Sequence, residues 1–177
     1  MEILRQQTQP LNGSQGITAQ SSIKDQFGRT FNYLRIAVNE HCNLRCIYCM
    51  PEEGIHFRTE EKLLKTEEIC RIIEIMSGMG VSKMRFTGGE PLLRKDLPEL
   101  IQFANDTDGV ESIHLTTNGL LLDKHIKKLE DTGLNGINIS LDSLNPEKFK
   151  KITRRDSLDM VLNGLKKAIQ SYIPSIK

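Results

Sequence analysis

YLRIAVNEHCNLRCIYCMP, residues 33–51, joins a short apolar run to a group of three cysteines. The run at 33–38 is apolar and β-branched, which predicts a buried strand. Cys42, Cys46 and Cys49 follow within eight residues in the pattern Cys-x3-Cys-x2-Cys. A strand that ends in a polar, chemically active loop is the unit that recurs along this sequence.

The spacing of the three cysteines favours an iron–sulfur cluster with one open iron. A 4Fe–4S cube has four iron corners and prefers thiolate ligands, so three close cysteines leave one corner free. An open coordination position is typical of catalytic metal sites. The alternatives are a zinc site or a chance grouping of buried thiols. Zinc needs a fourth ligand nearby, but His41 adjoins Cys42 and Cys70 lies far downstream on a predicted helix.

Strands and helices alternate along the chain. Further strands are predicted at 83–87, 112–117 and 136–141, and a fifth opens at 174–177. Helices follow them, and their predicted starts are Thr66, Asp96, Asp123, Asn145 and Ser157. We expect the side chains of Thr66, Asp96 and Asp123 to act as N-caps. The alternation predicts an α/β fold with about four βα units around a parallel sheet.

Each predicted strand ends in a polar motif. Gly88-Gly89-Glu90-Pro91 follows the second strand, residues 116–118 close the third, and residues 140–142 close the fourth. Chemistry in parallel sheets collects beyond the carboxyl ends of the strands. The sequence therefore predicts one active site, shared by these motifs and the cysteine loop.

Composition narrows the class of protein. At 177 residues, the chain is long enough for one domain with a proper core. The net charge of +1, with both signs interspersed, gives no reason to expect nucleic acid or an anionic membrane as a partner. No apolar run is long enough to span a bilayer and no targeting segment is recognisable, so we expect a cytoplasmic protein. Residues 1–27 are expected to be a flexible tail and residues 28–177 the core domain.

The sequence resembles the radical S-adenosylmethionine (radical SAM) superfamily. The cysteine pattern, with Tyr48 before the last cysteine, is similar to that superfamily's cluster motif, and Gly88–Pro91 is similar to its second motif. More narrowly, six stretches resemble the GTP 3',8-cyclase family of molybdenum cofactor biosynthesis: 27–29, 33–35, 48–51, 85–92, 116–119 and 138–142. The resemblance covers the chain from about residue 25.

The resemblance implies an incomplete, TIM-like β/α barrel, of which this chain holds only part. It implies one 4Fe–4S cluster on Cys42, Cys46 and Cys49, whose free iron binds SAM. Reductive cleavage of SAM then yields a 5'-deoxyadenosyl radical, which in the family removes the ribose 3' hydrogen of GTP and leads to closure onto C8 of guanine. The implied partners are GTP as substrate, a reductant such as flavodoxin or ferredoxin, and cyclic pyranopterin monophosphate synthase downstream.

The resemblance also assigns binding residues. Those matched to SAM contacts are Tyr48, Gly88, Gly89, Glu90 and Ser140, and those matched to GTP contacts are Arg35, Arg85, Thr116 and Lys177. Glycine lets backbone approach a ligand closely, and cationic side chains suit a triphosphate. Simpler explanations are a surface charge for either arginine, core packing for Tyr48, and backbone hydrogen bonding for the two hydroxyls.

The chain departs from the family at its end. Family members carry three further cysteines, which bind a second cluster that holds guanine, but this sequence has no cysteine after Cys70. A fragment of a longer product is the favoured explanation, and a short independent protein is the other. We expect such a chain to bind one cluster but not to turn over GTP. The alternative functions are a radical SAM enzyme acting on another substrate, such as a peptide, and a non-catalytic metal-binding module.

Overall fold

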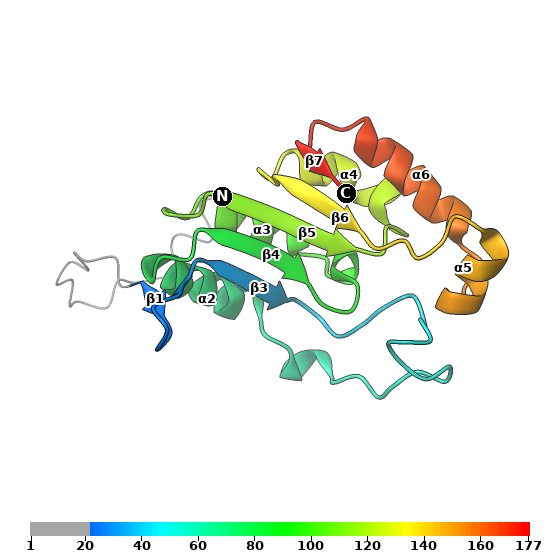
Figure 1. Cartoon of the computed structure of the whole chain (residues 1–177), viewed down its shortest axis with the longest axis horizontal. Coiled ribbons are helices and arrows are strands. Elements are labelled where there is room, and N and C mark those ends of the chain that lie inside the picture. The colour runs from blue at the N-terminus through cyan, green and yellow to red at the C-terminus, as the bar shows by residue number, and fades with distance from the viewer. Residues whose placement is uncertain (1–21) are drawn as a thin grey trace.

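Five parallel strands run through the centre of the molecule, of which a computed structural model describes residues 22–177 (Figure 1). In order across the sheet they are β3 (Tyr33–Ala37), β4 (Lys83–Thr87), β5 (Ser112–Thr117), β6 (Gly136–Ile139) and β7 (Ser175–Ile176). The spatial order equals the chain order, so each new strand is added on the same side of the last. The predicted α/β fold and its parallel sheet are confirmed, and the sheet is open rather than closed into a barrel.

Helices connect the strands and cover one face of the sheet. They are α2 (Thr66–Gly78), α3 (Leu97–Asn105), α4 (Leu122–Glu130), α5 (Pro146–Thr153) and α6 (Leu158–Ile169), with short 3-10 turns η1 (Glu60–Lys62) and η2 (Pro91–Leu93). Figure 1 shows α2, α3 and α4 behind the sheet, α6 beside β6 and β7, and α5 beyond the carboxyl end of β6. Crossovers of one hand that advance in one direction place their helices on the same face.

The main core lies between this face and the helices. Met84, Phe86 and Leu115 point from the strands into it and are fully buried. Ile69 and Ile73 from α2 meet them, together with the apolar side chains of α3 and α4. A second, smaller cluster lies at the carboxyl end of the sheet. Its members are Leu44, Cys46, Leu120, Phe149, Leu158 and Val161.

Of the three expected N-caps, Asp96 is confirmed as an N-cap residue, whereas Thr66 and Asp123 are wrong. The N-cap of α2 is Lys65 and that of α4 is Leu121, so Thr66 and Asp123 lie inside their helices. Asp96 is the N-cap of α3, but its side chain makes no capping bond. It accepts a hydrogen bond of 2.5 Å from the Thr66 hydroxyl instead. The side chains of Thr66 and Asp96 therefore bond to each other instead of capping their own helices.

A small antiparallel hairpin precedes the sheet, formed by β1 (Ile23–Lys24) and β2 (Thr30–Phe31). The predicted flexible tail, 1–27, falls largely on residues 1–21, which lie outside the described residues, so that boundary stays a prediction. None of the helices in residues 22–177 has the length and apolar character needed to cross a lipid bilayer.

Candidate active site

The cysteine loop leaves the carboxyl end of β3 and runs to the start of α2 (Figure 1). Its three cysteines are free thiols: Cys46 is buried, Cys42 is half-buried and Cys49 is exposed. The Cys46 carbonyl accepts hydrogen bonds from the backbone N–H groups of Cys49 and Met50, at 2.9 and 3.2 Å. This turn brings the second and third cysteines to the same end of the loop.

Gly88 and Gly89 lie directly against the first residues of the cysteine loop. The N–H of Gly89 donates to the Asn39 carbonyl at 3.0 Å, and that of Glu90 donates to the His41 carbonyl at 2.7 Å. A Cβ on Gly89 would lie 2.3 Å from the His41 oxygen, and one on Gly88 would lie 2.5 Å from the Asn39 oxygen. Glycine is therefore required here by the approach of the chain's own backbone, a reason that the sequence analysis did not foresee.

Glu90 holds the ends of β4 and β5 together. Its carboxylate is completely buried and accepts hydrogen bonds from the Thr117 hydroxyl at 2.7 Å, the Asn118 N–H at 2.8 Å and the Leu92 N–H at 3.0 Å. Burial raises the pKa of Glu90, although these hydrogen bonds act in the opposite direction. In this arrangement the carboxylate contacts protein groups, and its expected contact with SAM stays a prediction.

Asn118 belongs to the polar motif predicted to close the third strand, but it was not among the candidate binding residues. Its side-chain amide donates to Asn43 Oδ1 at 2.7 Å and approaches Cys42 Sγ at 3.8 Å. Its Oδ1 accepts from the Leu120 N–H at 3.1 Å, which fixes the orientation of the amide. The signal available in the sequence was its place at the end of a strand, beside the residues already chosen.

Tyr48 and Ser140 are both exposed, one in the cysteine loop and the other just after β6. Tyr48 is 63% exposed, so it does not pack into the core. Its hydroxyl donates to Asp142 Oδ2 at 2.9 Å, which links the cysteine loop to the end of β6. Burial, together with the neighbouring Asp142 and Cys46, raises the pKa of the Tyr48 hydroxyl. Ser140 is exposed, and its backbone N–H donates to the Thr117 carbonyl at 2.8 Å.

The face of the sheet opposite the helices is polar. Arg35, Arg85 and His114 are register partners on β3, β4 and β5, so they form one row across it. Arg85 donates through Nε to the Tyr33 hydroxyl at 2.8 Å and through Nη1 to the Thr116 hydroxyl at 3.0 Å. Arg35 is exposed. The structure thus brings three of the residues matched to GTP contacts onto one surface.

Lys177 is the fourth residue matched to GTP. Its backbone pairs with β6, because its N–H donates to the Ile137 carbonyl at 2.9 Å and its carbonyl accepts from the Ile139 N–H at 2.7 Å. Lys83 and Asn138 belong to the same open face and were missed. Side chains two residues apart in a strand share a face. Counting back two residues from Arg85 gives Lys83, and counting back two from Ser140 gives Asn138, so both could have been predicted.

The imidazole ring of His114 lies on this face and packs closely against its neighbours. His114 Nε2 lies 3.1 Å from the Ser112 hydroxyl, and a Cβ on the adjacent Gly136 would come within 2.6 Å of Nδ1. Burial lowers the pKa of His114, and the charges of Arg85 and Lys177 lower it further. The ring is thus biased toward its neutral form by the cationic face on which it lies.

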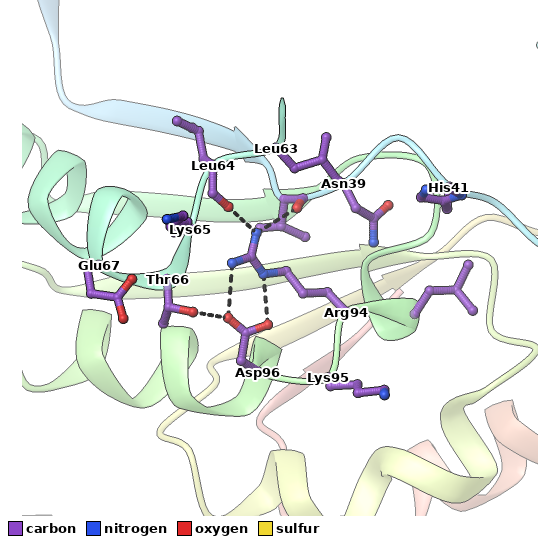
Figure 2. A pocket seen from close by; sticks show the side chains of 12 residues that line it. Asn39, His41, Leu63, Leu64, Lys65, Thr66, Glu67, Arg94, Lys95 and Asp96 are labelled. Carbon is purple, nitrogen blue, oxygen red and sulfur yellow. Dashed lines mark hydrogen bonds and ion pairs between the residues drawn. The ribbon is translucent and has the colours of Figure 1, made fainter. Parts of the chain in front are cut away.

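A pocket of about 760 Å³ lies at the base of the cysteine loop. Figure 2 shows the side chains that line it. Arg94 Nη1 donates to the carbonyls of Val38, where the loop begins, and Leu64, near its end, at 2.9 and 3.0 Å. Arg94 Nε also pairs with Asp96 Oδ1 at 2.9 Å. Burial would raise the pKa of Asp96, but hydrogen bonds from Arg94 and Thr66 outweigh it, so the pKa is lowered. Arg94 thus closes the base of the loop, a role with no local sequence signal.

The donors in the loop are of the kind that an iron–sulfur group requires, since all three are free cysteine thiols. A cube takes each thiolate at a separate iron and prefers this soft donor. Burial raises the pKa of the Cys42 and Cys46 thiols, so ligation there releases protons.

Fold and site together define an α/β protein whose open parallel sheet carries a three-cysteine loop and a Gly-Gly-Glu-Pro motif at one edge. The sequence profile of the Radical SAM superfamily matches residues 36–177. The chain belongs to the radical SAM superfamily, and membership implies an enzyme that uses SAM and a 4Fe–4S cluster.

Individual relatives are more specific. The chain is 49% identical over 155 residues to a GTP 3',8-cyclase of Listeria monocytogenes serotype 4b, a match that covers 88% of this chain and 46% of that protein. It is 41% identical over 176 residues to the molybdenum cofactor biosynthesis protein moc-5 of Caenorhabditis elegans, covering 99% of this chain and 29% of that protein. The chain thus spans less than half the length of these relatives.

Among solved structures, the hydrogenase maturase HydG superposes with a TM-score of 0.66 at 18% identity, covering 81% of this chain and 33% of that one. At this identity the likeness concerns the fold alone. It agrees with the predicted partial radical SAM architecture.

Proposed function

We propose that the chain forms the cluster-binding and SAM-binding part of a GTP 3',8-cyclase of molybdenum cofactor biosynthesis. The observation that carries the proposal is that the cysteine loop lies at the carboxyl end of a sheet whose open face presents Arg35, Arg85 and Thr116. The names of relatives at 41–49% identity support it. The reaction converts GTP to (8S)-3',8-cyclo-7,8-dihydroguanosine 5'-triphosphate.

In this proposal Cys42, Cys46 and Cys49 would hold one 4Fe–4S cluster, whose remaining iron would bind SAM. When bound, these cofactors supply a 5'-deoxyadenosyl radical by reductive cleavage. The chain's own residues position them. Gly88 and Gly89 keep the base of the loop close to the strand ends, where Tyr48 and Ser140 are exposed to meet SAM.

The open face is the proposed GTP surface. Arg85 is already oriented by Tyr33 and Thr116, so its guanidinium loses little freedom on binding a phosphate. Arg35 lies beside it in register, and Lys177 follows β7 on the same sheet. Three cations on one face suit a triphosphate, whereas a neutral peptide backbone offers them no matching charge.

The wider context of the proposal follows from the chemistry. Three free thiols that must stay reduced suit the cytoplasm, where a small electron carrier such as flavodoxin or ferredoxin supplies the electron. The cyclised nucleotide would pass to cyclic pyranopterin monophosphate synthase.

Anaerobic reconstitution of the full chain tests this proposal. We expect about four irons per chain, visible absorption from the cluster, and release of 5'-deoxyadenosine from SAM on reduction. Zinc without visible absorption would overturn the proposal in favour of a metal-binding module.

Calorimetry tests the substrate. Arg85→Met is expected to weaken GTP binding about tenfold to a hundredfold, because a charge-assisted hydrogen bond to phosphate is lost. The control is Arg71→Ala, which removes an exposed cation paired with Glu74 on the outer surface of α2. Equal GTP affinity in both variants and the unchanged chain would contradict a GTP site on the open face.

A further inference from the structure

The tip of the cysteine loop is gripped by the end of α5, a helix more than a hundred residues further along the chain. The N–H groups of Arg45 and Ile47 donate to the carbonyls of Thr153 and Ile152 at 3.0 and 2.9 Å. The last carbonyls of a helix have no partner within it, so these bonds satisfy α5 and fix the loop together.

Arg154 completes this grip with its side chain. Its Nη1 donates to the carbonyl of Arg45 at 3.1 Å and to the carbonyl of Met50 at 3.0 Å. These two carbonyls stand on either side of the segment that contains Cys46 and Cys49. A single guanidinium nitrogen therefore ties both ends of the segment to one point.

The backbone of Arg154 is held in an unfavourable conformation. It is the only non-glycine residue in the described part of the chain with a positive φ, at 54°. The left-handed conformation costs free energy in any residue that has a Cβ, because the Cβ comes too close to the following carbonyl oxygen. Asparagine can offset this cost by a local hydrogen bond of its side chain, but arginine cannot. Such strain persists only where the surrounding structure compensates for it. Here the compensation is the pair of bonds to the cysteine loop.

Apolar packing links the same two segments. Leu44 and Cys46 from the loop share the smaller apolar cluster with Phe149 of α5, which is 1% exposed. Polar and apolar contacts thus hold the loop on the same helix.

We propose that Arg154 is a positioning residue for the cysteine loop, which holds the segment from Arg45 to Met50 in the conformation that presents its thiols to a cluster. The inference deepens the proposed function, since it concerns the loop to which that function assigns the metal group. Arg154 itself touches neither substrate nor cofactor in this assignment.

Three variants of the full chain test the inference. Arg154→Gly suits the positive φ and removes the guanidinium, whereas Arg154→Lys keeps a cation that can reach the two carbonyls. Lys151→Ala removes an exposed cation from the same last turn of α5 and serves as the control.

The first measurement is hydrogen exchange in cluster-free protein, so that it does not depend on metal. We expect Arg154→Gly to speed exchange of the Arg45 and Ile47 amides at least about tenfold, while the thermal midpoint stays level or rises because strain is relieved. Arg154→Lys should restore most of the protection, and the control should match the unchanged chain. Exchange at the unchanged rate in Arg154→Gly overturns the inference. So does a lower midpoint with faster exchange throughout the chain, since that marks a general structural role.

The second measurement is the rate at which a chelator removes the reconstituted cluster, followed by its visible absorption. Arg154→Gly should lose the cluster several-fold faster than the control. Equal rates in the two would contradict the inference. If the unchanged chain takes up no cluster, the proposed function fails, while hydrogen exchange still decides whether Arg154 positions the loop.

Discussion

The two faces of the five-stranded sheet differ in what they bury and what they offer. On the helix-covered face, Met84, Phe86 and Leu115 are fully buried. On the open face, the same strands present Arg35 and Arg85, and the second of these is oriented by neighbouring hydroxyls. One face therefore supplies the free energy of folding, and the other supplies the groups that can meet a ligand.

This difference is informative because parallel sheets are usually apolar on both faces. The interior of a β/α barrel is commonly filled by branched apolar side chains. Strands β3 and β4 alternate instead, as half-buried strands do. A parallel sheet with one polar face indicates a surface reserved for a charged ligand.

The largest expected effect comes from the covered face. Phe86→Ala should lower the free energy of unfolding by about 4 kcal/mol, because it leaves a cavity in the main core. The variant to compare on the open face is Arg35→Ala, on the adjacent strand β3. It should change the free energy of unfolding by no more than about 0.5 kcal/mol. Urea unfolding of both variants measures the contrast. A similar cost for the two would remove the distinction between the faces.

The second effect concerns the edge where the two faces meet. Gly89→Ala should cost about 1–3 kcal/mol and reduce cluster uptake, because the new Cβ cannot occupy the space held by the His41 carbonyl without displacing the loop. Gly78→Ala is the matched control, since a Cβ there meets nothing within 4 Å. Because Gly78 lies in a helix, Gly78→Ala should leave the free energy of unfolding unchanged or raise it by up to about 1 kcal/mol. Full cluster uptake in Gly89→Ala would contradict the close approach.

The smallest effect is a pH dependence that belongs to the open face. The folded pKa of His114 lies below its usual value of 6.5 because of burial and the facing charges of Arg85 and Lys177. A depressed folded pKa contributes stability above the unfolded value, and that stability is lost as pH falls below it. His114→Gln should therefore flatten the stability profile between about pH 7 and 5. Burial also lowers the pKa of His125, but this residue is kept in both proteins, so a difference between their stability profiles reports His114. Identical profiles would refute this assignment.

Much of the fold was open to prediction from local pattern. The predicted strands at 33–38, 83–87 and 112–117 agree with β3, β4 and β5 to within one residue. In each, apolar residues alternate with polar ones and the strand ends at glycine or a polar motif, so periodicity and end signals were sufficient to place it. The prediction that the strand at 33–38 is buried was wrong, since Tyr33, Arg35 and Ala37 are exposed. Thr66 was wrong as an N-cap, and Asp96 is the N-cap residue of α3 but makes no capping bond with its side chain. The reason is that these two side chains bond to each other and Asp96 also pairs with Arg94. Local rules fail where a distant partner offers a better bond.

The candidate site divides in the same way. Cys42, Cys46 and Cys49 were found because their chemistry depends on residue type and on spacing over a few positions. Arg94 and Arg154 were not found, since each acts on carbonyls far away in sequence. A backbone carbonyl belongs to every residue, so the sequence holds no mark of which one a distant guanidinium will meet.

By itself, the sequence determined that this protein has alternating strands and helices, a three-thiol loop, and polar motifs at the strand ends. Those features follow from residue type, period and short spacing. Only the tertiary structure decided that one face of the sheet stays polar and that Glu90 is buried between strand ends. It also decided that the cysteine loop is held at its base by Arg94 and at its tip by Arg154. These are contacts between residues distant in the chain, and they exist only once the helices have packed and placed them.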